Sequence, residues 1–233
     1  MSLLTAVLVT AVVWGVGMIR SLRWKALAYS LPLPITLVLL SSGMRVDASQ
    51  VVGVVLLNVF FYAVAAAFRL GLPIWAADLV GIGVYIGLSW STAALGALPF
   101  WPVLAGAAVL WAAFLPFRPP AATTPPATGN ALLRLGVLFA VTLSVVALAG
   151  ALRGLVVTFP YSGVLVAVEV RRSLSDFARH FTRNSVALLA FFTAYHATQH
   201  HGTAWALTAA WSAFAVTALV LNLTRPEVEQ VDT

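Results

Sequence analysis

Long apolar stretches, separated by short polar connections, run along almost the whole chain. A bilayer core about 30 Å thick needs about 20 apolar residues in a helix that crosses it. None of the stretches alternates between apolar and polar positions as a strand would, and only a helix satisfies its own backbone in lipid. The pattern therefore predicts an all-α, polytopic membrane protein. Its nine expected helices cover residues 3–19, 26–44, 51–68, 72–90, 98–117, 131–151, 155–170, 184–199 and 203–223.

The composition agrees with this interpretation. Of the 233 residues, 61% are hydrophobic and 9% are charged, whereas soluble domains have about 25% charged residues. In a membrane protein, a net charge of +6 reflects the orientation of the helices and contact with anionic lipid headgroups, and does not indicate nucleic-acid binding. The basic run at 20–25 follows the first apolar stretch instead of preceding it, so we expect that stretch to remain as a helix and not to act as a signal peptide.

The basic residues favour one orientation. Nine helices place the two termini on opposite sides of the membrane. With the N-terminus outside, eleven of the thirteen lysines and arginines lie in the cytoplasm, and Arg45 and Arg153 remain outside. The positive-inside rule prefers this arrangement, so we expect a multi-pass protein with a cytoplasmic C-terminus.

The two halves of the chain share a sequence pattern. The first reads LAYSLPLPITLVLLSSG and later VVLLNVFFYAV, and the second reads VVTFPYSGVLVAVEVRR and later SVALLAFFTAY. Pro32 matches Pro160, and seven positions before each proline stands a basic residue, Lys25 or Arg153. The alternative to a true repeat is coincidence between apolar helices of similar composition.

A repeat divides the chain into three parts. Residues 1–97 would form a first four-helix unit, 98–130 a spacer helix with a Pro-rich cytoplasmic linker, and 131–233 a second four-helix unit. A single spacer helix reverses the second unit, so the repeats would be inverted. Inverted repeats are common in secondary transporters, which hold their site near the bilayer midplane.

Each unit has a basic residue before its second helix and an LPLP or FPYSG turn early in that helix, and the third helix is rich in aromatic residues, among them Phe60, Phe61 and Tyr62. In these features each unit resembles the GlpM-like family of small four-helix bacterial inner-membrane proteins. The resemblance covers most of both halves through short motifs, and the tandem duplication with a fifth helix departs from the family. It implies a bacterial cytoplasmic-membrane location and an association with exopolysaccharide production, and it carries no established chemistry.

Prolines interrupt two of the expected helices. Pro32 and Pro34 lie in the second, and Pro160 lies in the seventh. Proline removes a backbone donor, and the carbonyl groups it frees must face protein or water in a membrane. Interrupted helices at matching positions in two halves indicate a transporter site, and the alternative is a packing kink.

Polar side chains inside expected helices are the other pathway candidates. Asp78 has no basic residue within a turn in sequence, so it is the candidate for a proton relay or ion site. Glu169 is expected to pair with a nearby arginine or to lie at the membrane interface. Asn58 and His196 are expected to form interhelical hydrogen bonds, with a place in the pathway as the alternative.

Lys25 and Arg153 would occupy equivalent places on opposite faces of an inverted repeat, where they could receive an anionic group. The alternative is that each extends to lipid phosphates at the membrane surface. The basic, amphipathic segment 171–183 is expected to lie on the cytoplasmic membrane surface. Its candidate lipid-phosphate contacts are Arg171, Arg172, Arg179 and Arg183.

The sequence has no P-loop, zinc-protease pair or Gly-x-Ser-x-Gly elbow, which argues against an ATP-driven pump and an enzyme. We expect no metal or cofactor. The function favoured is a small secondary transporter or lipid flippase for an anionic or lipid-linked substrate, with membrane lipids as partners and no nucleic acid. The alternative is a non-transporting subunit that scaffolds a cell-envelope or exopolysaccharide synthesis complex, and an intramembrane enzyme ranks last.

Overall fold

The structure is a computed structural model that describes residue 19 and residues 21–114 and 161–223. Within these residues all regular structure is helical and there is no strand, which confirms the all-α class for this part of the chain. Three helices, at Ala48–Arg69, Ile74–Thr92 and Thr203–Leu223, are long and apolar enough to cross a membrane. The expected helices 3–19 and 131–151 and the linker 119–130 lie outside the described residues.

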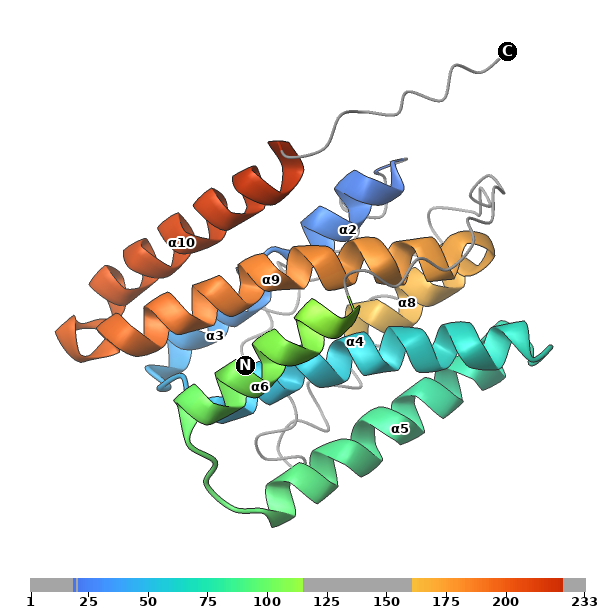
Figure 1. The fold of residues 1–233 in the computed structure, drawn as a ribbon, viewed down its shortest axis with the longest axis horizontal. Helices are drawn as coiled ribbons and strands as arrows, with labels where there is room; N and C mark the ends of the chain where they lie inside the picture. The colour runs from blue at the N-terminus through green and yellow to red at the C-terminus, as the bar shows by residue number, and fades with distance from the viewer. Residues whose placement is uncertain (1–18, 20, 115–160, 224–233) are drawn as a thin grey trace.

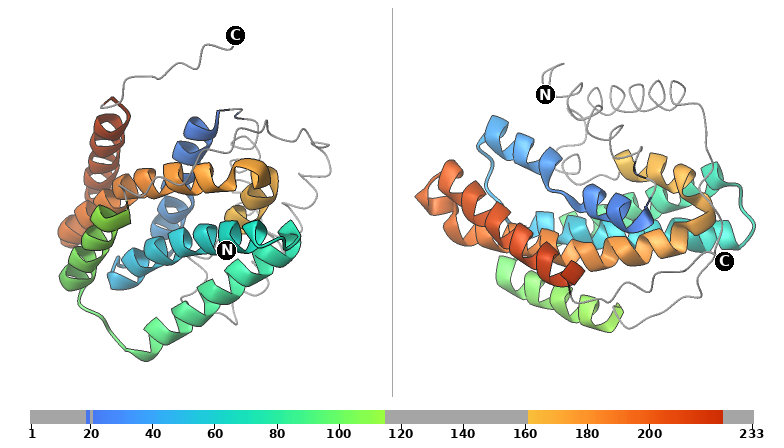
Figure 2. Two further views of the ribbon diagram at one scale, coloured as in Figure 1. Left: turned by 45° about the vertical axis from the view of Figure 1, so that its right-hand side comes forward. Right: turned by 90° about the horizontal axis from the view of Figure 1, so that it is seen from above.

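The expected helix 26–44 is broken in two (Figure 2). Helix α2 spans Leu22–Ser30 and helix α3 spans Leu33–Ser42, and the backbone between them is extended at Leu31. Pro32 precedes α3 as its N-cap, and the backbone N–H and the hydroxyl of Thr36 both donate to the Pro32 carbonyl. Pro34 lies in the first turn of α3, where the missing N–H costs no hydrogen bond. The prediction of an interrupted helix is therefore confirmed at this position, whereas Pro160 lies outside the described residues.

A helical hairpin follows. Helix α4, Ala48–Arg69, begins with a capping box in which the Asp47 carboxylate accepts from backbone N–H groups and Gln50 reaches back to the Asp47 N–H at 2.8 Å. Helix α5, Ile74–Ala94, returns along α4 after a turn at Gly71, whose φ of 91° favours glycine. Helix α6, Phe100–Phe114, then packs against α4.

The second half has a short helix, a long helix and an outer helix. Helix α8 covers Tyr161–Glu169, a 3₁₀ turn covers Arg171–Ser173, and helix α9 covers Leu174–Thr198. After a second 3₁₀ turn at Gln199–His201, helix α10 covers Thr203–Leu223 and packs along α9.

The expectation that residues 171–183 lie on the membrane surface is wrong. Residues from Leu174 onward form the first turns of α9, continuous with the expected helix 184–199. Phe177 and Phe181 are buried, and their ring centroids lie 5.1 and 5.0 Å from that of Phe61 on α4. The apolar residues of this segment therefore face the protein core, because they continue the buried face of α9.

Helices α4 and α9 form the centre of the bundle. They pack against each other and run in opposite directions, with α5 outside α4 and α10 outside α9 (Figure 1). The α4–α5 turn and the start of α9 lie at one end, and the α9–α10 turn lies at the other. The core has two apolar clusters, one around Phe60, Phe61 and Phe177, and one around Phe191 and Phe192.

Candidate functional site

The middles of α4 and α9 meet at a buried pair of polar side chains. Asn58, halfway along α4, donates from Nδ2 to the Val54 carbonyl at 2.8 Å and to the Ser185 hydroxyl of α9 at 3.1 Å. A carbonyl oxygen only accepts, so the Val54 contact fixes which end of the amide is the nitrogen. Asn58 Oδ1 is buried and has no hydrogen-bond partner in the described part of the chain. The expected interhelical bond is confirmed, and one acceptor of Asn58 is left for a further donor.

A second set of polar contacts lies one turn away and joins a third helix. The Trp111 indole of α6 donates to the Thr182 carbonyl of α9 at 2.8 Å. The Thr182 hydroxyl lies 2.8 Å from the Ala178 carbonyl and 3.2 Å from the Tyr62 hydroxyl of α4. Together with Asn58 and Ser185, these side chains form what we call the central polar layer: Asn58, Tyr62, Trp111, Thr182 and Ser185.

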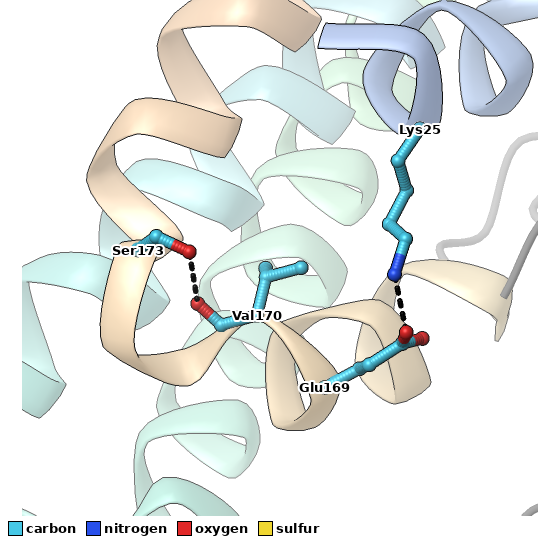
Figure 3. Close-up of polar contacts among 4 residues, drawn as sticks. All are labelled: Lys25, Glu169, Val170 and Ser173. Carbon is cyan, nitrogen blue, oxygen red and sulfur yellow. Dashed lines mark hydrogen bonds and ion pairs between the residues drawn. The ribbon is translucent and has the colours of Figure 1, made fainter. Parts of the chain in front are cut away.

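A buried ion pair joins the two halves of the chain at one end of the bundle. The Lys25 ammonium of α2 contacts Glu169 Oε1 at the end of α8 (Figure 3). Only 3% of the Lys25 side chain and 14% of the Glu169 side chain are exposed. Close by, the Ser173 hydroxyl donates to the Val170 carbonyl at 3.4 Å (Figure 3). The Ser173 N–H donates to the same carbonyl at 2.8 Å and closes the turn into α9. Removing one member of such a pair deprives the other buried charge of this partner.

This pair changes one expectation and adds a partner to another. Lys25 does not extend to lipid phosphates, because its side chain turns inward and is neutralised by Glu169. Glu169 pairs with a lysine 144 positions away in sequence, and its expected pairing with a nearby arginine stays a prediction. Arg153, the expected counterpart of Lys25, lies outside the described residues.

Asp78 is a buried carboxylate in the second turn of α5. Its side chain is 3% exposed, and neither oxygen has a hydrogen-bond partner among the residues that the structure describes. An ionised carboxylate is costly in an apolar environment without such partners. Asp78 therefore needs a proton, a water molecule or a cation, and its expected place in an ion pathway stays a prediction.

His196 lies at the opposite end of the bundle from the ion pair. Its Nδ1 donates to the Val46 carbonyl at 2.7 Å, and its ring stacks on Phe100 of α6 at 3.8 Å between centroids. Gln199 holds both backbone groups of Val46, since its Oε1 accepts from the N–H at 2.9 Å and its Nε2 donates to the carbonyl at 3.1 Å. The hydrogen bond of His196 therefore goes to the loop before α4 and not, as expected, to another helix, and its contact with helix α6 is ring stacking. No cluster of three metal-binding side chains occurs in residues 21–114 or 161–223.

Two arginines bind the end of α10. Arg183 of α9 donates to the Leu221 carbonyl, and Arg23 of α2 donates to Oδ1 and the carbonyl of Asn222 at 3.2 and 2.8 Å. The guanidinium groups satisfy carbonyls that a helix C-terminus leaves unpaired. Arg183 was expected to contact lipid phosphate; the structure shows it bound to the Leu221 carbonyl, and the phosphate contact stays a prediction.

The other three arginines expected to contact lipid phosphate lie near the start of α9. Arg179 lies 3.8 Å from the Asp176 carboxylate on the same helix, and Arg171 and Arg172 lie in the 3₁₀ turn before α9. Among the candidate pathway residues that the structure describes, Lys25 and Glu169 contact each other. Asn58 lies at mid-bundle and His196 at the far end.

Sequence reasoning missed Ser185, Thr182 and Trp111. Serine and threonine in a helix often bond to their own backbone, and Trp111 reads as an ordinary membrane-interface residue. The spacing of Thr182 and Ser185, which puts them on one face of α9, was the available signal for those two residues, and Trp111 gave none. Comparison with protein families, with curated proteins and with solved structures gives no match to this chain.

Proposed function

We propose that this protein is a small secondary transporter or lipid flippase of the bacterial cytoplasmic membrane, acting on an anionic or lipid-linked substrate. The observation that carries the proposal is the central polar layer. Two antiparallel helices from the two halves of the chain cross there, and Asn58 Oδ1 is buried without a partner. Inverted-repeat transporters place their substrate sites at such midplane crossings. The proposal involves no chemical step on the substrate.

The pattern of exposed side chains supports a membrane location. Helix α5 exposes Trp75 at its start and Trp90 near its end, and α10 exposes Trp205 at its start. Tryptophan is enriched at both membrane–water interfaces. Between these positions α5 and α10 expose apolar residues, among them Leu79, Ile86, Val216 and Leu219.

The course of the helices supports two inverted units. In each half a short helix leads into a long central helix, α4 or α9, and an outer helix, α5 or α10, returns along it. The two central helices run in opposite directions, as inversion requires. Arg69 at the end of α4, and Arg171 and Arg179 near the start of α9, lie at one end of the bundle. The positive-inside rule assigns that end to the cytoplasm, and the proposal keeps the N-terminus outside.

The GlpM-like resemblance remains part of this proposal: a four-helix module, duplicated and reversed within one chain. A scaffolding subunit is the weaker alternative. Segment 171–183 would be the natural partner-binding surface of such a subunit, but its apolar side chains, such as Leu174 and Phe177, are buried in the bundle.

Lipid movement in proteoliposomes tests the proposal. The purified protein is reconstituted with a fluorescent acidic phospholipid, phosphatidylglycerol labelled on its acyl chain end, and the outward fraction is measured by quenching with dithionite. Radiolabelled inorganic phosphate is followed in parallel as a soluble anion. We expect one of these probes to cross faster than in protein-free liposomes, because the central polar layer can accept hydrogen bonds from a polar group in transit.

Matched variants separate transport from leakage. Asn58→Leu and Ser185→Ala remove groups of the central polar layer and should reduce the movement. Ser212→Ala should leave it unchanged, because that hydroxyl lies on the exposed face of α10 and bonds to its own helix at Thr208. Equal movement in all three variants, or none of either probe in the folded wild type, would refute transport through this layer.

A further inference from the structure

Helix α5 has a polar stripe on its buried face. Asp78, Tyr85 and Ser89 are all buried. At 3.6 residues per turn, positions 78, 85 and 89 fall within about 40° of one another around the helix. We call these three residues the α5 stripe. The rest of the helix surface exposes apolar residues, with Leu79 and Ile86 beside the stripe and Val80 opposite it.

This distribution is the reverse of that in a water-soluble helix. Helix α5 is one of the three helices apolar enough to cross a membrane, and its polar groups point away from the surface that lipid would contact. Ionisable residues in such positions are rare, and they face protein or water-filled space on ion and proton routes. Asp78 has no hydrogen-bond partner in the described residues, so packing alone does not account for it.

The spacing of the stripe fits a proton better than a metal cation. At a rise of about 1.5 Å per residue, Asp78 lies about 10 Å from Tyr85 along the helix, and Tyr85 lies about 6 Å from Ser89. A sodium or calcium ion needs several oxygens within about 2.6 Å at once, and these three side chains cannot supply them together. A carboxylate that gains and loses a proton, followed by hydroxyl groups that both donate and accept, can pass a proton through intervening water.

The ionisable side chains on the described neighbouring helices have partners or places other than Asp78. Among the helices that the structure describes, α4 and α8 make the main contacts with α5. On α4 the ionisable side chains are Tyr62, which contacts Thr182 in the central polar layer, and Arg69, which is exposed at the turn. On α8, Glu169 is paired with Lys25.

We infer that the α5 stripe is the proton path of this protein, with Asp78 as the group that takes up and releases the proton at the end of α5 where the helix begins. A proton binds a carboxylate oxygen of Asp78, passes to water and the hydroxyls of Tyr85 and Ser89, and leaves at the other end, so that no other bond is made or lost. The inference deepens the proposed function, because such a path would couple transport to the proton gradient.

Proton movement into proteoliposomes tests the inference directly. The full chain is reconstituted with the pH dye pyranine inside, and valinomycin with an outward potassium gradient sets an inside-negative potential. We expect the wild type to acidify the interior, and Asp78→Asn to reduce this rate to that of protein-free liposomes. Ser89→Ala should cause a partial loss. Its matched control, Ser91→Ala, should cause none, because the Ser91 hydroxyl is exposed and bonds to the Gly87 carbonyl of its own helix at 2.9 Å.

Gel filtration in detergent shows whether each variant is folded. A folded Asp78→Asn variant that acidifies the interior like the wild type would overturn the inference, as would equal rates for Ser89→Ala and Ser91→Ala. A dependence of the rate on sodium instead of protons would also overturn it. If lipid or phosphate moves but protons do not, the proposed function stands and the proton path is wrong. If protons move but neither lipid nor phosphate does, the proton path stands and the proposed function is wrong.

Discussion

Replacing Lys25 by methionine tests the buried ion pair most sharply. Methionine has a similar shape and no charge, so Lys25→Met leaves the Glu169 carboxylate in its place with 14% of its side chain exposed. Breaking a buried pair by removing one partner costs about 3–5 kcal/mol, which is a large part of the roughly 5–15 kcal/mol that stabilises a typical protein. We therefore expect Lys25→Met to lower the free energy of unfolding by an amount in that range.

A double variant distinguishes the effect of breaking the ion pair from the effect of removing a lysine. Lys25→Met combined with Glu169→Gln removes both charges, and we expect a stability close to that of the wild type or above it. Arg69→Met is the control, because Arg69 is an exposed basic residue at the same end of the bundle, and its loss should change stability by less than about 0.5 kcal/mol. The assay is unfolding by sodium dodecyl sulfate in mixed micelles, followed by the fluorescence of the eight tryptophans. A Lys25→Met protein as stable as the wild type would refute the reasoning and would indicate that Lys25 extends to lipid headgroups.

Two further predictions concern packing. Gly81→Ala should destabilise the protein by about 1–3 kcal/mol in the same assay, because its Cβ would lie 2.4 Å from Val64 Cγ2, whereas Gly83→Ala meets open space and should be neutral. Destabilisation by Gly83→Ala equal to that by Gly81→Ala would contradict the packing of α4 on α5. His196→Ala should speed amide hydrogen exchange around Val46, whose carbonyl would lose a donor, and unchanged exchange there would contradict the contact.

The helices were predictable where the apolar pattern is strong. The expected helices 51–68, 72–90, 98–117 and 203–223 coincide closely with α4, α5, α6 and α10. The break before α3 was also predictable, because proline cannot donate a backbone hydrogen bond and the residue before it avoids helical geometry. These features depend on local sequence alone.

The start of α9 was not predictable from hydropathy. Asp176, Arg179 and Arg183 lower the hydropathy of its first three turns, so the segment resembled a surface helix. The structure shows that Leu174, Phe177 and Phe181 continue the buried face of the helix. The amphipathic pattern of a helix does not show whether its apolar face contacts lipid or protein.

The polar contacts of the site could not be predicted for a different reason. Lys25 and Glu169 are 144 positions apart, Arg23 and Asn222 are 199 apart, and Asn58 and Ser185 are 127 apart. Sequence could identify Asn58, Asp78 and Glu169 as costly groups within a membrane. It could not show which of them has a partner, because the partner comes from another helix whose rotation is fixed only by packing.

The central claim is that the two helical hairpins, α4–α5 and α9–α10, cross the membrane in opposite senses. The chain contains no cysteine, so single cysteines can be placed at Leu70, in the α4–α5 turn, and at His201, in the α9–α10 turn, both of which are exposed. With a membrane-impermeant maleimide applied to intact cells, we expect His201→Cys to be labelled at once and Leu70→Cys only after the membrane is permeabilised. Labelling of both cysteines from the same side would contradict the inverted arrangement and the transporter built on it.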